Sequence, residues 1–256
     1  MNAKELFSIQ GKKAIVTGGS RGLGRGMAEG LLEAGCETVI IGSSEKTFEA
    51  ADAFVKKGLN CKAVKADLGS RPDVFSAFNE AVEKLGGDLD ILIIAHGIQR
   101  RHSAEVFPLE DWDEVINVNL NSVFILCKEA ANIMLKKGYG KIITVSSMVA
   151  WFGGQTVPAY TASKGAVTQL TKELSNDWIA RGINVNSIAP GYMATEMNSA
   201  LLDPASPRYE QITARIPAGR WGTPDDMKGA AVFLASHASD YLGGCILPVD
   251  GGYLVK

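Results

Sequence analysis

Short apolar runs alternate with longer amphipathic segments along the whole chain, and this order constrains the fold more than any other feature. The runs are rich in β-branched residues: KAIVT (13–17), ETVII (37–41), CKAVKA (61–66), DILIIA (90–95), GKIITVS (140–146), INVNSIA (183–189) and GCILPVD (244–250). Continuous apolar strands separated by helices are typical of a parallel sheet that is buried on both faces. We therefore expect an α/β protein with a doubly wound parallel sheet of about seven strands and helices on both faces.

The segments between these runs have apolar residues at every third or fourth position, as amphipathic helices do. They include residues 24–35, 45–58, 73–86 and 225–239. Because no repeat, low-complexity tract or long polar linker interrupts the alternation, residues 1–256 are expected to form a single domain. The Pro-rich segment LLDPASPRYEQ is interpreted as part of a mobile substrate-loop insertion around residues 193–220, not as a domain boundary.

The composition excludes several classes of partner. With 28 acidic and 26 basic residues, a formal net charge of −2 and no long basic run, the chain is not suited to capture nucleic acid or an anionic membrane. No apolar run reaches the ~20 residues that span a bilayer, and the N-terminal segment lacks the apolar core of a signal peptide. The four cysteines are scattered without C-x-x-C spacing, which favours reduced thiols over disulfides or a zinc site. We expect a cytoplasmic protein that acts on a small molecule and holds no metal.

A glycine-rich turn, TGGSRGLGRG (17–26), follows the first apolar run and precedes the first amphipathic segment. Gly18, Gly22 and Gly24 would permit positive φ angles and let the backbone approach a pyrophosphate, whose charge the N-terminus of the next helix stabilises. A purely structural tight turn is the alternative. The position in a strand-turn-helix unit favours dinucleotide binding.

Tyr160 and Lys164 lie four residues apart in AYTASKGAVTQL (159–170), so one helical turn brings them to the same face. Free tyrosine has a pKa near ~10. A neighbouring ammonium, joined by a positive nicotinamide ring, would lower that pKa and make the phenol a proton donor and acceptor. Taken alone, the pair is also compatible with an exposed lysine beside a half-buried tyrosine.

Together these motifs resemble the short-chain dehydrogenases/reductases. The family signature T-G-x-x-x-G-x-G is met by Thr17, Gly18, Gly22 and Gly24, and Y-x-x-x-K by Tyr160 and Lys164. Ser147 precedes Tyr160 by thirteen residues, the spacing of this family. The resemblance covers essentially the whole chain and implies a Rossmann-type fold that binds NAD or NADP and transfers hydride between the nicotinamide and a secondary alcohol or ketone.

The resemblance also implies residue roles. Tyr160 would exchange the proton, Ser147 would hold the reacting oxygen, and Asn119 would keep a water in line with Lys164. The implied cofactor-binding residues are Gly18, Ser20, Arg21, Gly22, Leu23, Gly24, Ser43, Ser44, Asp67, Leu68, Gly97, Tyr160, Lys164, Pro190, Gly191 and Thr195.

The sequence departs from the family at the end of the fourth strand, where the usual N-N-A-G reads IAHG (94–97). Ala95 replaces the second asparagine, whose amide is thought to brace the strand ends, and this puts cofactor affinity in question. His96 stands in the place of the family's alanine and is expected to pack beside the cofactor loop rather than to act in catalysis.

The second strand ends in Gly42, Ser43 and Ser44, without the carboxylate that would accept hydrogen bonds from the ribose hydroxyls of NAD. Serine hydroxyls together with the cation Arg21 would suit a 2′-phosphate. The pattern therefore leans towards NADP, although Glu45 lies close by.

Directly after Gly97, IQRRHS (98–103) places two arginines at the carboxyl edge of the sheet, where Arg100 and Arg101 could bind a carboxylate. A solvated basic loop is the alternative. With RIPAGRWGTPDD (215–226), this segment resembles the sugar-acid branch of the family, which acts on 2-deoxy-D-gluconate, gluconate and their keto forms. Further candidate substrate contacts are Trp151, Gln155 and Tyr192, of which Trp151 could equally serve packing or a subunit interface.

Two alternatives stay open at this point: a 3-oxoacyl-acyl carrier protein reductase, which shares the core motifs, and a dinucleotide-sensing protein without turnover. Residues 109–138 are apolar on more of their circumference than a surface helix needs, which suggests burial against another subunit. Since the family is typically tetrameric, a homotetramer is expected.

Overall fold

The computed structural model describes residues 1–203, 205 and 207–256. Its seven strands form one parallel sheet in the order β3-β2-β1-β4-β5-β6-β7. The strands are β1 (Lys13–Thr17), β2 (Glu37–Gly42), β3 (Cys61–Lys65), β4 (Ile91–Ile94), β5 (Gly140–Val145), β6 (Ile183–Pro190) and β7 (Ile246–Val249). Each coincides with one of the apolar runs to within one residue at its carboxyl end or lies inside it, so the predicted sheet is confirmed.

The α-helices of the described residues follow the amphipathic segments. They are α1 (Ala3–Leu6), α2 (Gly22–Glu33), α3 (Lys46–Lys56), α4 (Arg71–Lys84), α5 (Leu109–Ile116), α6 (Ser122–Lys137), α7 (Pro158–Trp178), α8 (Pro207–Arg215) and α9 (Lys228–Ala235). Residues 109–138 do not form one regular helix, because a π-helical turn, η2 (Asn117–Asn121), separates α5 from α6.

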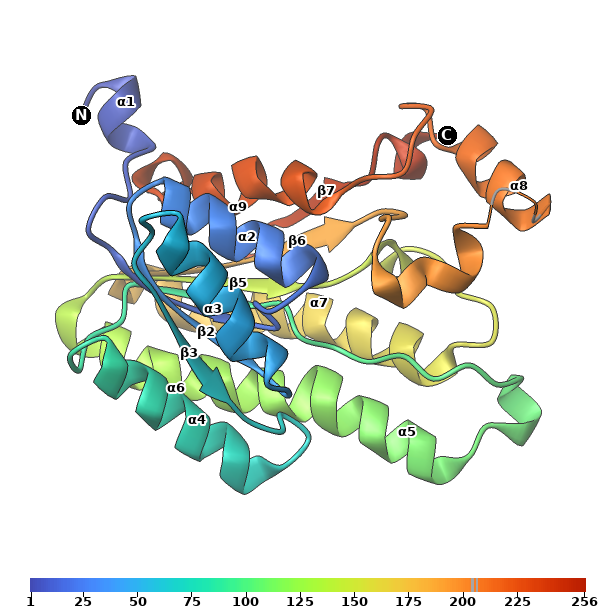
Figure 1. The fold of residues 1–256 in the computed structure, drawn as a ribbon, viewed down its shortest axis with the longest axis horizontal. Coiled ribbons are helices and arrows are strands. Elements are labelled where there is room, and N and C mark those ends of the chain that lie inside the picture. The colour runs from blue at the N-terminus through green and yellow to red at the C-terminus, as the bar shows by residue number, and fades with distance from the viewer. Residues whose placement is uncertain (204, 206) are drawn as a thin grey trace.

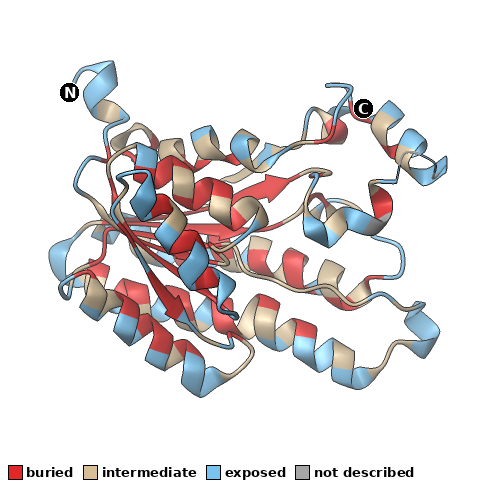
Figure 2. Cartoon of the chain, viewed as in Figure 1, coloured by how far each residue is buried: buried red, intermediate tan, exposed pale blue. Residues whose placement is uncertain are grey.

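Helices cover both faces of the sheet (Figure 1): α2, α3 and α9 on one side, and α4, α6 and α7 on the other. Successive strand residues serve opposite layers, since Ile15 packs with the second set of helices and Val16 with the first. The strands are buried almost throughout and the helices only along their inner sides (Figure 2). This burial on two faces explains why the strand segments are continuously apolar and the helices are not.

The order of the strands identifies the end of the sheet at which ligands are expected to bind. Strand β1 pairs with both β2 and β4, so the crossovers run in opposite directions from this point. In open parallel sheets, ligands bind beyond the carboxyl ends of the strands at such a switch point. The loops after β1, β4, β5 and β6 are therefore the ones that matter for function.

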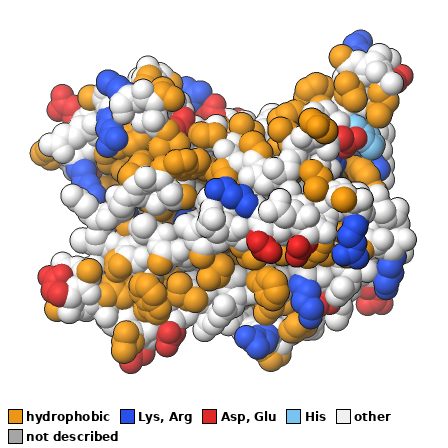
Figure 3. All heavy atoms as spheres, turned by 180° about the vertical axis from the view of Figure 1, so that it is seen from behind, with side chains coloured by type: hydrophobic (Ala, Val, Ile, Leu, Met, Phe, Trp, Pro, Cys, Tyr) orange, Lys and Arg blue, Asp and Glu red, His pale blue; other side chains and the backbone are white. Residues whose placement is uncertain are grey.

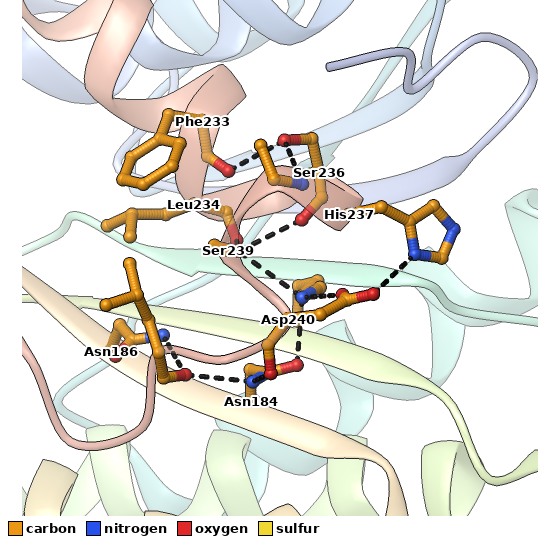
Figure 4. Close-up of polar contacts among 11 residues, drawn as sticks. Asn184, Asn186, Phe233, Leu234, Ser236, His237, Ser239 and Asp240 are labelled. Carbon is orange, nitrogen blue, oxygen red and sulfur yellow. Dashed lines mark hydrogen bonds and ion pairs between the residues drawn. The ribbon is translucent and has the colours of Figure 1, made fainter. Parts of the chain in front are cut away.

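A buried polar network closes the amino-terminal end of the sheet near β7. Lys141, at the start of β5, is fully buried, and its Nζ donates to Asn184 Oδ1 at 2.8 Å and to Asp240 Oδ1 at 2.6 Å. Asp240 also accepts from His237 Nδ1 at 2.9 Å, and the amide of Asn184 donates to the Asp240 carbonyl (Figure 4). These contacts tie the segment that precedes β7 to strands β5 and β6.

The segment expected to be a substrate-loop insertion, residues 193–220, contains a 3₁₀ helix, η5 (Glu196–Leu201), and α8. Its positions 204 and 206 lie outside the described residues. Ile212 and Leu201 pack with Trp221 and Tyr253, so a small apolar cluster joins the segment to the C-terminal part of the chain. In the part of the chain that the structure describes, no helix has the length and apolarity needed to cross a membrane.

Candidate active site

The glycine turn has the backbone geometry that the sequence predicts. Gly18 and Gly22 have φ angles of +68° and +54°, a region that side chains with a Cβ rarely adopt. A Cβ on Gly24 would overlap the carbonyl oxygen of Gly18, so the first turn of α2 packs directly on the loop. The turn therefore presents bare backbone and the N-terminus of a twelve-residue helix to the site.

A cavity of about 960 Å³ lies at the carboxyl ends of the strands. Most predicted cofactor residues line it: Gly18, Ser20, Arg21, Gly22, Leu23, Gly24, Ser43, Asp67, Leu68, Gly97, Pro190, Gly191 and Thr195. So do most of the predicted catalytic and substrate residues: Ser147, Tyr160, Lys164, Arg100, Arg101, Gln155 and Tyr192. Among the residues that the structure describes, Ser44, Asn119 and Trp151 do not line the cavity.

Tyr160 and Lys164 stand one turn apart on α7, as predicted. The Nζ of Lys164 lies 5.7 Å from the centre of the Tyr160 ring and donates to the carbonyl of Val145, the last residue of β5, at 2.7 Å. Burial lowers the pKa of Lys164 to about 8. The strand end thus fixes the ammonium beneath the phenol in a position where its charge is weakly solvated.

The expected acidification of the phenol by Lys164 is wrong for the chain by itself. Burial raises the pKa of Tyr160 above its ordinary value, because the phenolate loses solvation, and a hydrogen bond with Ser147 and the charge of Arg101 act against this. Lys164 is not among these causes. The second part of the expectation, a contribution from the nicotinamide charge, stays a prediction.

Ser147 is the N-cap of a short 3₁₀ helix, η3 (Met148–Ala150), and its Oγ accepts from the backbone N–H of Val149 at 3.4 Å. Its extended backbone directs the hydroxyl towards Tyr160 from the end of the β5 segment. The serine and the tyrosine can therefore contact one substrate oxygen together.

Asn119 lies in the π-helical turn η2 and is completely buried. Its Oδ1 accepts from the Ile98 N–H at 2.9 Å, and its Nδ2 donates to the Ile98 carbonyl at 2.9 Å and to Ser163 Oγ at 3.2 Å. The role expected for it, holding a water near Lys164, stays a prediction. What the contacts establish is that the amide fixes the loop after β4.

The two neighbouring arginines differ. Arg100 forms ion pairs with Glu114 (Nη2 to Oε2, 2.7 Å) and Asp111 (Nε to Oδ1, 3.7 Å) and also lines the cavity, and its role in binding a substrate carboxylate stays a prediction. Arg101 is turned towards the reacting groups. Burial and the nearby charge of Arg208 lower its pKa, and the charges of Tyr192 and Tyr160 act in the opposite direction. Arg101 is therefore close enough to both Arg208 and Tyr160 for their charges to influence its own.

Arg21 is also engaged. Its Nη1 lies 2.6 Å from Glu196 Oε2 in η5, an ion pair whose side chains are both about two thirds exposed. The predicted phosphate ligand thus links the glycine turn to the substrate-loop segment. Glu45, which was expected to weaken NADP binding, is paired with Lys65 at 2.6 Å.

Sequence inspection missed several residues that line the cavity, namely Glu114, Phe152, Arg208, Arg215 and Tyr253. The guanidinium of Arg215 lies 4.3 Å from the ring centre of Tyr253 and 5.8 Å from that of Phe152. These residues come from segments far apart in the chain, and only Arg215 belongs to a segment that the sequence analysis uses, RIPAGRWGTPDD (215–226). Only the cationic composition of the 208–220 segment could have hinted at them.

The chain is similar to enzymes of known class over nearly its whole length. The family model described as enoyl-(acyl carrier protein) reductase matches residues 18–254. The 2-dehydro-3-deoxy-D-gluconate 5-dehydrogenase of Bacillus subtilis (strain 168) is 45% identical over 252 residues, which cover 98% of each chain. The chain belongs to the short-chain dehydrogenase/reductase family. The predicted resemblance is confirmed.

Two further members of the short-chain dehydrogenase/reductase family align over the full length. Gluconate 5-dehydrogenase of Gluconobacter oxydans (strain 621H) is 39% identical over 258 residues and covers 100% of both chains. The crystal structure of a gluconate 5-dehydrogenase from Burkholderia cenocepacia J2315, in complex with NADP and tartrate, superposes with a TM-score of 0.94 at 40% identity and 100% coverage of both chains. The fold and the enzyme class of this short-chain dehydrogenase/reductase therefore rest on relatives that match it from end to end.

Proposed function

We propose that the protein is an NADP-dependent oxidoreductase that interconverts a secondary alcohol and a ketone in a sugar acid of the gluconate or 2-deoxygluconate type. The observation that carries this proposal is the position of Arg101: a guanidinium beside a second one, Arg208, in the same cavity as the Ser147 and Tyr160 pair. Two guanidinium groups at the wall of one cavity favour a ligand with a negative charge. A substrate with a carboxylate near its reacting carbon fits this cavity. The names of the full-length relatives support the same substrate class.

The residues present fit a nicotinamide dinucleotide. The glycine turn leaves a cradle that a Cβ would fill, and the N-terminus of α2 can stabilise a pyrophosphate. Ser20, Arg21 and Ser43 line the cavity and offer hydroxyl and guanidinium donors to a 2′-phosphate, and Glu45, which follows β2, is paired with Lys65. These features favour NADP over NAD. Structures of relatives with bound NADP support the same preference.

When bound, the cofactor supplies or accepts the hydride. Ser147 holds the substrate oxygen by a hydrogen bond that strengthens as negative charge develops. Tyr160 takes the hydroxyl proton during oxidation and returns it to the carbonyl oxygen during reduction. The hydrogen bond from Ser147 and the charge of Arg101 favour the phenolate that accepts this proton. The ammonium of Lys164, fixed by the Val145 carbonyl, lies 5.7 Å from the centre of the Tyr160 ring and keeps a positive charge beside the reacting centre.

Substrate access involves residues 193–220. Arg208 and Leu201 of this segment line the cavity, and Glu196 joins it to Arg21 through an exposed, easily broken ion pair. We propose that the segment opens for substrate exchange and closes over the bound sugar acid.

We also propose that the enzyme is a cytoplasmic homotetramer. Large apolar side chains are exposed at the start of α5 and on α6: Leu109, Trp112 and Phe124 have exposed fractions of 75%, 36% and 47%. Hydrophobic side chains are also prominent on the face shown in Figure 3. Such surfaces are commonly covered by another subunit. All four cysteines are free thiols, as proteins of a reducing compartment usually have.

A substrate panel tests the proposed function. Initial rates are measured with gluconate, 2-deoxygluconate and their keto forms, each with NADP and NAD in the matching redox state, and with an acetoacetyl thioester and NADPH. The proposal expects turnover of a sugar acid with NADP. Faster turnover of the thioester would favour a carrier-protein reductase instead, and cofactor binding without turnover of any substrate would favour a dinucleotide sensor.

A further inference from the structure

His96 occupies a junction between the glycine turn and the π-helical turn η2. It lies two residues after the end of β4, and its backbone nitrogen lies so close to Gly18 that a Cβ on that glycine would approach it to 2.8 Å. Its side chain contacts both turns: Nδ1 lies 2.7 Å from Thr17 Oγ1, and Nε2 lies 2.7 Å from Ser122 Oγ and 3.1 Å from the Val118 carbonyl. Every polar atom of the ring is thus paired.

These partners favour one tautomer of His96. A carbonyl oxygen only accepts, so the 3.1 Å contact with Val118 favours a proton on Nε2. Ser122 Oγ donates to the same carbonyl at 2.7 Å and can accept from His96 through a lone pair. The bare Nδ1 then accepts from the Thr17 hydroxyl, which itself accepts from the Ala95 N–H at 3.2 Å. Burial and the charge of Lys164 lower the pKa of His96 to about 3, in agreement with a neutral ring.

The contacts of His96 and Asn119 run in opposite directions between the same two segments. His96 reaches from the end of β4 to Val118 and Ser122, and Asn119 reaches from the π-helical turn back to both backbone groups of Ile98. Gly97, a predicted cofactor contact, lies between the two. The hydrogen bond between His96 and Thr17 extends the same network to the start of the glycine turn (17–26).

We propose that neutral His96 is a positioning residue that sets the spacing between the glycine turn and η2, and thereby the affinity for the nicotinamide dinucleotide. The sequence suggested that Ala95 leaves this strand end without a side-chain brace, and in the structure the imidazole of the next residue connects the same strand ends. This inference rests on the proposed use of NADP, and it is tested by binding experiments that need no substrate.

The tautomer is tested by ¹⁵N NMR of the full-length protein labelled at histidine. The chain has only three histidines, so a His96→Leu variant assigns the signal by its loss. At pH 5.5, where an ordinary imidazole with a pKa of about 6.5 is mostly charged, His96 is expected to stay neutral with a proton on Nε2 only. A charged ring, or a proton on Nδ1, would overturn the assignment.

The positioning role is tested by the NADPH dissociation constant, measured from cofactor fluorescence. His96→Leu, which keeps an apolar bulk but no hydrogen bonds, is expected to weaken NADPH binding at least tenfold. His96→Asn restores a polar atom near the position of Nδ1 and His96→Gln one near the position of Nε2, so each should recover part of the affinity. His237→Leu, at the opposite end of the sheet, is the matched control and should bind as the wild type does.

A merely structural role predicts a different pattern, in which all three His96 variants lower the midpoint of thermal unfolding while the folded protein binds NADPH normally. That result would refute the proposal. If His96→Leu does not fold, Thr17→Val and Ser122→Ala remove the same bonds from the partner side and should weaken NADPH binding instead. A wild-type protein that binds no NADPH would refute the proposed cofactor, whereas normal binding by the His96 or partner variants would refute the positioning role alone.

Discussion

The ammonium of Lys164 is held by the carbonyl of Val145 at 2.7 Å, while it lies 5.7 Å from the ring centre of Tyr160. The end of a buried strand, and not the phenol, therefore fixes the lysine. This arrangement leaves the hydroxyl of Tyr160 to Ser147 and the substrate, and it places a weakly solvated positive charge below the reacting centre.

Tyr160→Phe removes the only atom proposed to exchange a proton with the substrate. We expect kcat to fall by a factor of about 10² to 10⁴, the usual contribution of a positioned acid-base group. Because the aromatic ring and Lys164 remain, the NADPH dissociation constant should change less than twofold. Steady-state rates and fluorescence titrations measure the two quantities, and a variant with a near-normal kcat would exclude Tyr160 from the chemistry.

Arg101→Gln should raise KM for the sugar acid about 10- to 100-fold, since a hydrogen bond to a charged group contributes roughly 1.5–3 kcal/mol. Arg100→Gln is the matched control, because Arg100 is already paired with Glu114 and Asp111. Loss of these partly exposed pairs should change KM less than about fivefold. Equal increases in KM for the two variants would contradict a specific role of Arg101 in binding the substrate carboxylate.

Much of this site could be predicted from the sequence, because its main parts are local. The glycine turn depends on φ angles that only its own residues determine, and Tyr160 and Lys164 share a face through one helical turn. The different partners of Arg100 and Arg101 could not be predicted. Both side chains line the cavity, and Arg100 is paired because α5 brings Asp111 and Glu114 beside it, a contact without a signal in the sequence around the two arginines.

Other residues of the cavity wall and the direction of the Tyr160 pKa shift could not be predicted from the sequence either. Arg215 and Tyr253 approach the site through the packing of the 193–220 segment on the C-terminal residues, a long-range contact without a local signal. Burial outweighs the neighbouring charge at Tyr160, and burial at a cavity wall is known only once all the surrounding segments are placed.

Glu196→Gln should tighten NADPH binding, because it releases Arg21 for the 2′-phosphate. An exposed ion pair contributes about 0.2–1 kcal/mol, so the dissociation constant should fall up to about fivefold. The affinity for NADH should stay unchanged, which provides the control. If Arg21→Gln weakens NADPH and NADH binding equally, Arg21 does not contact the phosphate.

Asp240→Asn should destabilise the fold by roughly 3 kcal/mol, since it leaves the buried ammonium of Lys141 with neutral partners only. Lys141→Met should cost less, because Asp240 is half exposed and can be solvated. Urea denaturation of both variants measures the difference. A larger loss for Lys141→Met would contradict the assignment of the buried charge as the costly partner.

The pH dependence of this effect follows from the pKa of Asp240. Burial alone would raise that pKa, but hydrogen bonds from Lys141 and His237 lower it below the ordinary value of 3.8. A carboxyl whose pKa is lower in the folded state stabilises the protein above the unfolded pKa, and this contribution is lost as the pH falls. The stability difference between wild type and Asp240→Asn should therefore be constant above about pH 5 and shrink below pH 3.8.

The most direct test compares kcat/KM for the preferred sugar acid with that for the corresponding polyol without the carboxylate, both with NADP. Arg101 beside Arg208 predicts that the acid is preferred by a factor of about 100, equivalent to a charge-assisted contact of nearly 3 kcal/mol. Equal values for the two compounds, or a preference for the polyol, would contradict the proposal that this enzyme recognises its substrate as an anion.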